Sequence, residues 1–260
     1  MNTIIFVITH KNFIGPKDEI YKTIIVGSRD LDIKNAYRDN TGVNIAYKNR
    51  NYCELTALYW IWKNFFDQDS ITGICHYRRF FSKSKYSKSN KYFLTKWDLK
   101  KIFSEYDIIL PEKNRWDVTV GEHYYNYGEG KEKDLLLLRE EISNICPEYL
   151  EDFDRIINAK SASYRNMFIT KKELLDEYCE WLFMILGELE NSISLDGYTE
   201  AEARVYGYLS EILLNVWVLH KNLRVKYMPI ILTEVSNIKI IKMRFRNIPA
   251  INSLLNFFNI

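Results

Sequence analysis

The chain has 260 residues, of which 47% are hydrophobic and 27% are charged, an ordinary globular composition. Its 36 basic and 34 acidic residues give a net charge of +2. This balance excludes general nucleic-acid binding, so no nucleic-acid partner is expected. The length suits one large domain, or a domain with a small appendage. We expect a single domain over residues 1–235, followed by a basic amphipathic tail over residues 236–260.

Sequence features related to cellular location point to the cytoplasm. The amino terminus lacks the basic start and apolar length of a signal peptide, and no apolar run approaches the roughly 20 residues of a membrane span. The cysteines, Cys53, Cys75, Cys146 and Cys179, lack Cys-x-x-Cys spacing. Such scattered cysteines are typical of buried thiols in a reducing compartment. The basic tail after Ile238 fits two alternatives equally, peripheral contact with the inner face of the cell membrane or a helix docked on the body.

Strand and helix patterns alternate along the first half of the chain. Short apolar runs predict strands over residues 4–9, 21–27, 71–75, 107–110, 164–170 and 225–233. Helical periodicity covers residues 51–64, 97–106, 134–144, 147–158, 172–189 and 199–220. Asn51 and Glu54 predict a capping box, whereas residues 112–130 are expected to be irregular. The predicted fold is α/β, with a mainly parallel sheet flanked by helices and a helical C-terminal part.

The densest group of chemically active side chains is His76-Tyr77-Arg78-Arg79, directly after a predicted buried strand. In parallel sheets, ligands bind at the carboxyl ends of strands. A guanidinium group binds phosphate oxygens in a bidentate fork, so adjacent arginines at this place favour a diphosphate ligand. The alternative is that one arginine pairs with a core carboxylate while the other faces water.

A second polar group spans residues 39–54. Its Asn and Asp side chains suit base edges and sugar hydroxyls, and the helix that follows offers free backbone N–H groups to an anion. The same residue types also form turns and caps. The candidate donor-binding residues are Thr9, His10, Asn40, Asn44, Tyr52, Tyr77, Arg78, Arg79 and Asn166.

Acidic pairs that could hold a metal occur only in unfavourable places. The Asp-x-Asp matches begin at Asp30, Asp67 and Asp152. The motif is short, the second match precedes its strand and the third lies on a predicted helix, so no metal site is predicted. Arg78 and Arg79 would then neutralise a leaving diphosphate. No cofactor is predicted, and a divalent cation such as manganese or magnesium stays an open alternative.

The predicted helix over residues 199–220 carries a candidate base. Arg204 and Glu211 are seven residues apart and share one face, and Gly207 between them allows a close approach by backbone or ligand. Glu211 could take a proton from an acceptor hydroxyl, and Asp196 in the preceding loop is a rival. The alternative places Arg204 in a structural ion pair and Glu211 on the solvent face. The candidate catalytic residues are thus Glu211, Asp196 and His76.

The sequence resembles a family of bacterial capsular and exopolysaccharide glycosyltransferases long catalogued as a domain of unknown function. The resemblance spans about residues 4–232, and its most specific part is the string Cys-His-Tyr-Arg-Arg ending at Arg79. The other matching stretches are residues 39–45, 51–56, 59–64, 109–111, 166–169, 178–183 and 204–217.

This resemblance implies a GT-A-like fold whose later half builds the acceptor side. It also implies a UDP-sugar donor, for characterised relatives galactofuranose, and inversion of configuration. By match, His76, Tyr77 and Arg78 occupy the place where other families have Asp-x-Asp. The acceptor, a glycan or a lipid-linked oligosaccharide, would meet His123, Tyr124, Tyr125 and Arg204.

Two other functions stay open at this point. The protein could be a non-catalytic nucleotide- or glycan-binding partner in polysaccharide assembly. A weaker alternative is a sugar-nucleotide hydrolase that releases free sugar without an acceptor.

Overall fold

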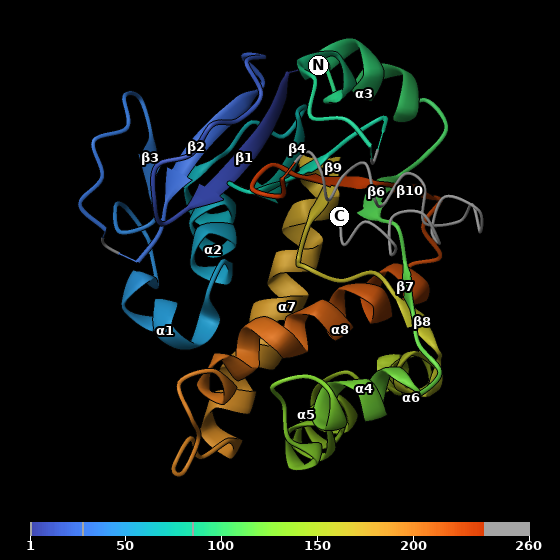
Figure 1. Ribbon diagram of the computed structural model, residues 1–260. Coiled ribbons are helices and arrows are strands. Elements are labelled where there is room, and N and C mark those ends of the chain that lie inside the picture. Colours follow the sequence, from blue (N-terminus) through green and yellow to red (C-terminus); the bar gives the residue numbers. More distant parts are fainter. Residues whose placement is uncertain (1, 28, 85, 237–260) are drawn as a thin grey trace, which may run out of the picture.

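A computed structural model, which describes residues 2–27, 29–84 and 86–236, shows a mixed sheet packed against a layer of helices (Figure 1). Most of the predicted tail, residues 237–260, lies outside the described residues. The sheet order is β10 (Val225–Met228), β6 (Ile108–Pro111), β9 (Phe168–Lys171), β4 (Ile71–His76), β1 (Thr3–Thr9), β2 (Tyr21–Ile25) and β3 (Tyr37–Arg38). Strand β5 (Arg79–Phe81) pairs with β4 and with β11 (Ile230–Leu232), while β7 (Asn114–Arg115) and β8 (Ser161–Ala162) pair separately.

Strands β4, β1, β2 and β3 run parallel to their neighbours in this series, so their carboxyl ends meet at one edge of the sheet. Strand β9 runs antiparallel to both β4 and β6. The predicted α/β sheet flanked by helices is confirmed, with β9 as a reversed strand inside it. The shared edge is the place where polar residues that follow the strands converge.

Strand β1 explains why the amino-terminal run is continuously apolar. Ile4, Phe6 and Ile8 belong to the core on one face of the sheet, and Ile5 and Val7 belong to the core on the other. A strand covered on both faces has no side left for polar residues.

Eight α-helices lie within the described part of the chain. They are α1 (Asn49–Tyr52), α2 (Leu55–Asn64), α3 (Lys96–Ile102), α4 (Val120–Asn126), α5 (Glu132–Ile145), α6 (Leu150–Asn158), α7 (Lys172–Ser192) and α8 (Val205–His220). Helix α7 packs on β4 and β9, and α5 and α6 pack on α7 and α8 on the side away from the sheet (Figure 1). Short 3-10 turns cover Ala46–Lys48, Asn90–Tyr92, Pro147–Tyr149 and Glu202–Arg204. None of the helices in the described ranges has the length and apolar character needed to cross a membrane.

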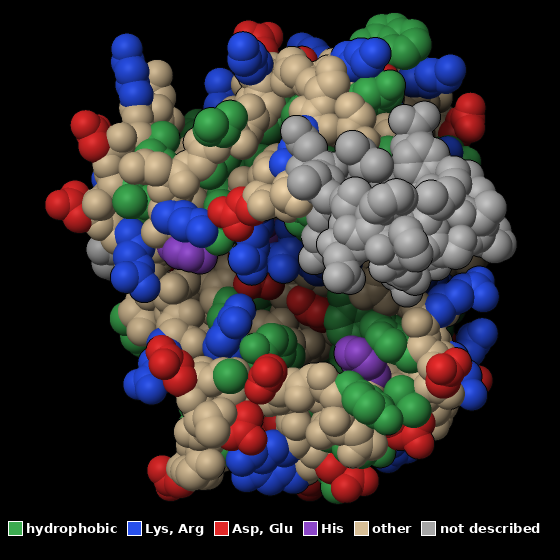
Figure 2. Space-filling view, in the orientation of Figure 1, with side chains coloured by type: hydrophobic (Ala, Val, Ile, Leu, Met, Phe, Trp, Pro, Cys, Tyr) green, Lys and Arg blue, Asp and Glu red, His purple; other side chains and the backbone are tan. Residues whose placement is uncertain are grey.

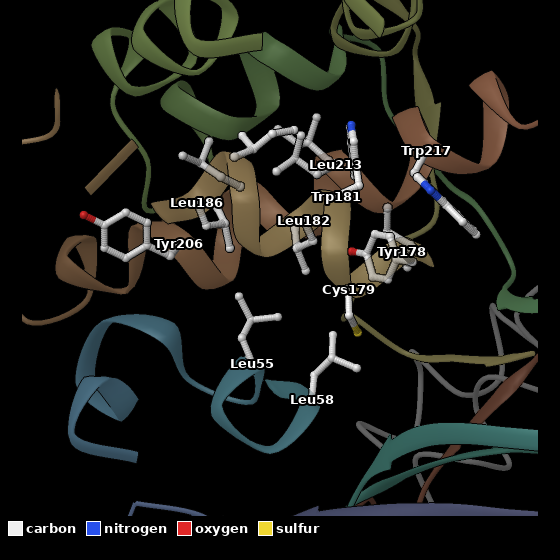
Figure 3. Packing of buried hydrophobic residues seen from close by; sticks show 14 of the residues in the cluster. Leu55, Leu58, Tyr178, Cys179, Trp181, Leu182, Leu186, Tyr206, Leu213 and Trp217 are labelled. Atoms are coloured by element: carbon white, nitrogen blue, oxygen red, sulfur yellow. The ribbon is translucent and has the colours of Figure 1, made fainter. Parts of the chain in front are cut away.

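The core between α2, α7 and α8 holds this helical layer together. Figure 3 shows Leu55 and Leu58 of α2 on one side and Leu182 of α7 facing them, with Trp217 of α8 at the far end. The Trp217 ring lies 5.2 Å from the ring of Tyr178. Long apolar stripes on α7 and α8 thus fix the position of α8 relative to the sheet.

The predicted helix over residues 51–64 is divided into α1 and α2. Cys53 between them has a φ of 52°, which ends α1, and the predicted capping box does not form. The Asn51 side chain instead donates a hydrogen bond to the Ala203 carbonyl at 2.7 Å. The break turns Glu54 toward α8, where it contributes to the site described below.

Helix α4 lies in the stretch that was expected to be irregular. Thr119 caps it by accepting a hydrogen bond from the Glu122 amide, and the Glu122 carboxylate accepts one from the Thr119 amide. This capping box is a signal that the sequence contained. His123 therefore occupies a fixed position on a helix instead of a loop.

Candidate functional site

A cavity of about 830 Å³ opens at the carboxyl ends of β1, β2 and β4. Figure 2 shows this face hollowed between the sheet and the helical layer, with basic and acidic side chains around the hollow. The cavity's basic and acidic residues are Arg29, Arg50, Arg78, Arg79, Arg165, Arg204, Glu54, Glu200 and Glu211. Six arginines against three glutamates make it a place for an anionic ligand.

One side of the cavity, here called the sheet wall, consists of residues His76–Arg79. His76 pairs with Arg79 across the β4–β5 hairpin, so Tyr77 and Arg78 form its two-residue turn. The ring of Tyr77 lies 5.1 Å from the ring of His10, which follows β1. The predicted His-Tyr-Arg-Arg group is thus assembled at the edge of the sheet, beside His10.

The two arginines of the sheet wall do not pair with a core carboxylate. Arg78 is exposed and its guanidinium lies 3.9 Å from the carboxylate of Glu234, itself exposed. Arg79 is half-buried, and within the described ranges no carboxylate lies at ion-pair distance from it. Burial and the neighbouring cations Arg78 and Arg165 lower the pKa of Arg79. An anion between these guanidinium groups would relieve their mutual repulsion.

The opposite side, here called the helical wall, consists of Glu54, Arg165, Asn166 and Glu211. Arg165 and Asn166 have left-handed backbones, with φ of 89° and 46°. Such conformations cost about 1–3 kcal/mol each and persist where surrounding contacts impose them. The Arg165 carbonyl accepts a hydrogen bond from His76, and the Asn166 amide donates to Glu54 at 2.7 Å and to the Gly207 carbonyl at 2.9 Å.

The predicted strand over residues 164–170 is wrong in its first part, because the strained turn occupies it and β9 begins only at Phe168. Because the prediction placed Arg165 inside a strand, this arginine was not among the predicted site residues. Asn166, which was predicted to bind the donor, is buried and shapes the helical wall. Its Oδ1 is buried and has no hydrogen-bond partner among the described residues.

Glu211 projects into the cavity from α8. Burial raises its pKa to about 8, and the negative charge of Glu54 adds to this effect. A backbone hydrogen bond from Arg165 and the charges of Arg165 and Arg79 act in the opposite direction. A carboxyl group balanced in this way can take up and release a proton near neutral pH.

His76 is neutral, because burial lowers its pKa more than Glu54 raises it. Its Nε2 lies 2.7 Å from the Arg165 carbonyl oxygen, which can only accept, so Nε2 carries the proton. The hydrogen bond joins the sheet wall to the helical wall. This contact indicates that His76 positions the strained turn.

Arg204, at the end of the 3-10 turn before α8, and Glu211 on α8 both line the cavity. Arg204 donates a hydrogen bond from Nε to the Cys53 sulfur at 3.1 Å. Burial, with the Glu54 charge, raises the pKa of the Cys53 thiol to about 11, so this cysteine is no nucleophile at neutral pH. A Cβ on Gly207 would lie 3.4 Å from the Cys53 side chain, an ordinary van der Waals contact.

The end of β2 forms a further part of the cavity around Gly27. This glycine has a φ of 69°, and a Cβ there would lie 2.5 Å from Asn49 Oδ1. The Gly27 amide donates to the buried carboxylate of Asp39 at 3.3 Å, and the Thr56 hydroxyl donates to the same oxygen. Only a residue without a side chain allows the cavity to continue past this point.

Several predicted donor-binding residues lie outside the cavity lining. Thr9 is buried, and its hydroxyl donates to the Lys11 carbonyl. Asn40 is exposed in the loop after β3, and Asn44 forms a turn by accepting from the Ala46 amide at 3.2 Å. The Tyr52 ring is stacked on Tyr206 in the core, at 4.7 Å between centroids.

Four more predicted residues, from the catalytic and acceptor sets, also lie outside the cavity lining. Asp196 is exposed in the loop after α7 and bonds to Ser194, away from the cavity. The Tyr124 hydroxyl donates to the buried Asp134 carboxylate at 3.1 Å, and Tyr125 packs against the main core. His123 is half-buried and contacts the rings of Trp116, Tyr127 and Tyr164.

No group of three or more His, Cys, Asp or Glu residues that could hold a metal ion occurs in residues 2–27, 29–84 and 86–236. The acidic pair on α6 has other contacts, since Asp152 bonds to His220 and Asp154 to Arg139. The positive charge at the end of β4 comes from arginines.

The sequence of residues 4–222 matches a family described as a domain of unknown function, DUF4422. The chain belongs to the DUF4422 family. Among curated proteins, none matches this sequence. A solved structure described as the apo form of WbbM, a bifunctional glycosyltransferase, is similar at 29% identity with a TM-score of 0.82.

The similarity to WbbM covers 90% of this chain and 46% of that chain. This DUF4422 chain therefore spans a little under half the length of the protein it matches. The agreement in topology confirms the predicted GT-A-like fold. The arginine-rich edge lies at the carboxyl ends of β1, β2 and β4 in this fold.

Proposed function

We propose that this DUF4422 protein is an inverting glycosyltransferase that transfers a sugar from UDP to a glycan acceptor. One observation carries the proposal: the cavity places a glutamate that titrates near neutral pH, Glu211, among six arginines. The similarity to a glycosyltransferase structure supports the same conclusion.

The arginines would hold the diphosphate of the donor. Arg78 and Arg79 occupy the sheet wall, and Arg165 faces them from the helical wall. Guanidinium groups stabilise the charge that develops on the diphosphate when the sugar–oxygen bond breaks. The nucleoside would extend toward Gly27 and Asn49, where the cavity continues along the end of β2.

Glu211 is the proposed general base, in preference to Asp196, which lies outside the cavity. Its carboxylate would take the proton from an acceptor hydroxyl as that oxygen attacks the anomeric carbon. The new carbon–oxygen bond forms while the bond to the diphosphate breaks, and UDP leaves with the bonding electrons. Attack from the side opposite the diphosphate inverts the configuration.

The substrates follow from the family resemblance. Uridine is the expected base, galactofuranose is the first donor sugar to test, and the acceptor belongs to a capsular or other surface polysaccharide. The base, the sugar and the acceptor are more specific than the residues of the cavity alone indicate. Those residues fit an anionic donor and a hydroxyl acceptor.

The test is calorimetric titration with UDP, with manganese and with EDTA, followed by an assay for sugar transfer. We expect UDP binding in EDTA, weakened about 10- to 100-fold in Arg79→Ala because charge-assisted hydrogen bonds are lost. Arg155→Ala on α6, outside the cavity, is the matched control. Binding only with manganese would contradict the arginine-held diphosphate.

The transfer assay separates the proposed activity from the other functions. UDP binding without turnover would support a non-catalytic partner, and release of free sugar as the only product would support a hydrolase. Absence of UDP binding under both conditions would contradict the proposal altogether.

A further inference from the structure

An aromatic group lies near Glu211, whose charge acts on Tyr164, and its elements β7 and α4 lie on the side of the molecule away from β2 and α1 (Figure 1). Trp116 follows β7, His123 is on α4 and Tyr164 precedes the strained turn. The rings of Trp116 and His123 lie 4.3 Å apart, and Tyr164 meets Trp116 edge-on at 5.1 Å. All three side chains are half-buried, so each keeps part of its surface open.

Tyr164 connects this group to the helical wall. Its hydroxyl is buried without a hydrogen-bond partner among the described residues, and the negative charge of Glu211 raises its pKa together with burial. Asn215, one turn after Glu211, bonds to both the amide and the carbonyl of Ser163, at 2.9 and 2.7 Å. The position of Tyr164 relative to Glu211 is therefore fixed by α8.

The surroundings of the group suit an uncharged ligand. Burial lowers the pKa of His123, so the imidazole is neutral at pH 7. Figure 2 shows hydrophobic side chains beside the hollow on the side of α4 and β7, where the opposite side carries basic ones. The charged part of a donor would thus stay near the arginines, and the aromatic part is left for a neutral ring.

We propose that Trp116, His123 and Tyr164 form the acceptor subsite, which stacks one face of a sugar ring and directs its hydroxyl to Glu211. The flat apolar face of an indole is suited to the C–H face of a sugar. This inference rests on the proposed function, because it places acceptor and diphosphate on opposite sides of the base. It adds Trp116 and Tyr164 to the residues that the sequence indicated.

Saturation-transfer NMR tests the subsite without turnover. The probes are UDP and the methyl glycosides of glucose, galactose, mannose and N-acetylglucosamine. In the wild-type protein loaded with UDP, we expect saturation of the ring protons of at least one glycoside. Trp116→Ala should reduce that saturation at least about threefold and leave the UDP signal unchanged, since stacking area is lost only at the sugar.

Two further variants sharpen the result. Trp116→Phe should retain part of the sugar signal, whereas Trp97→Ala, which removes an exposed tryptophan on α3, should change nothing. Unchanged sugar signals in Trp116→Ala would overturn the subsite, as would a lack of saturation for every glycoside while UDP binds.

The same experiment distinguishes this inference from the proposed function and from a donor-sugar site. With UDP-glucose and UDP-galactose as additional probes, a loss in Trp116→Ala of signal only from the hexose of the UDP-hexose would assign the aromatic group to the donor and overturn the acceptor subsite. A wild-type protein that gives no UDP signal would instead contradict the proposed function.

Discussion

The sheet wall and the helical wall of the cavity are built in different ways. The sheet wall comes from four consecutive residues on one hairpin, His76–Arg79. The helical wall combines residues from a break between two helices, a strained turn and the middle of α8. The sheet wall presents two adjacent arginines, and the helical wall holds Arg165 together with Glu211, the group that can exchange a proton.

This difference separates two tasks. Arginines bind a diphosphate in many relative orientations, so a hairpin turn at the sheet edge is sufficient to present them. A general base needs a defined distance to its substrate and a shifted pKa, which require burial and several supporting contacts. Changes of the glutamates in the helical wall should therefore affect turnover, and changes of the arginines in the sheet wall should affect donor binding.

The largest expected effect is on turnover in Glu211→Gln. Removing a general base costs about 10²- to 10⁴-fold in rate. UDP affinity should change little, because the diphosphate is held by the sheet wall. Steady-state kinetics together with UDP titration check both parts, and Glu200→Gln, an exposed glutamate at the same cavity, is the control. A Glu211→Gln enzyme with near wild-type turnover would return the search for the base to Asp196.

The contrast also explains what the sequence could predict. The sheet wall was found because its residues are adjacent and follow a recognisable buried strand. Glu211 and Arg204 were proposed because their seven-residue spacing predicts one helical face; both line the cavity, although Arg204 lies on the 3-10 turn before α8. The strands, most helices and the fold class followed from apolar periodicity in the same local way.

The residues whose roles could not be predicted from the sequence are placed by contacts between distant segments. Arg165 takes its role from a left-handed backbone that His76 and Gly207 stabilise from other elements. Glu54 faces the cavity only because Cys53 ends α1. Tyr52 was misplaced for the complementary reason: its polar hydroxyl suggested a ligand, whereas Tyr206 offered its ring a stacking partner in the core. Such pairings are set by tertiary packing, which periodicity does not encode.

A second, smaller effect concerns stability, and it should appear only in the helical wall. The pKa of Glu211 rises from 4.5 to about 8 on folding, so this carboxyl group ionises at a lower pH in the unfolded chain than in the folded one. The contribution of Glu211 to the stability is therefore fully present below pH 4.5 and is lost as pH rises through about 8. Because Gln cannot ionise, Glu211→Gln should be more stable than wild type at pH 9 by about 1–3 kcal/mol, but not at pH 5. Thermal unfolding at both pH values measures this difference; an equal change at both would show that ionisation is not responsible.

The smallest expected effect is on the pH dependence of the reaction, and it tests the coupling between Glu54 and Glu211. Only ionised Glu211 accepts a proton, so with a pKa of about 8 kcat/KM should increase about tenfold between pH 7 and pH 9. Glu54→Gln removes the negative charge that raises this pKa, and the rising part of the profile should move to lower pH. Arg78→Ala, in the sheet wall, should lower kcat/KM at every pH and leave the shape of the profile unchanged. A profile that stays in place in Glu54→Gln but moves in Arg78→Ala would show that the proton acceptor is controlled from the sheet wall, and the division of tasks between the two walls would then be wrong.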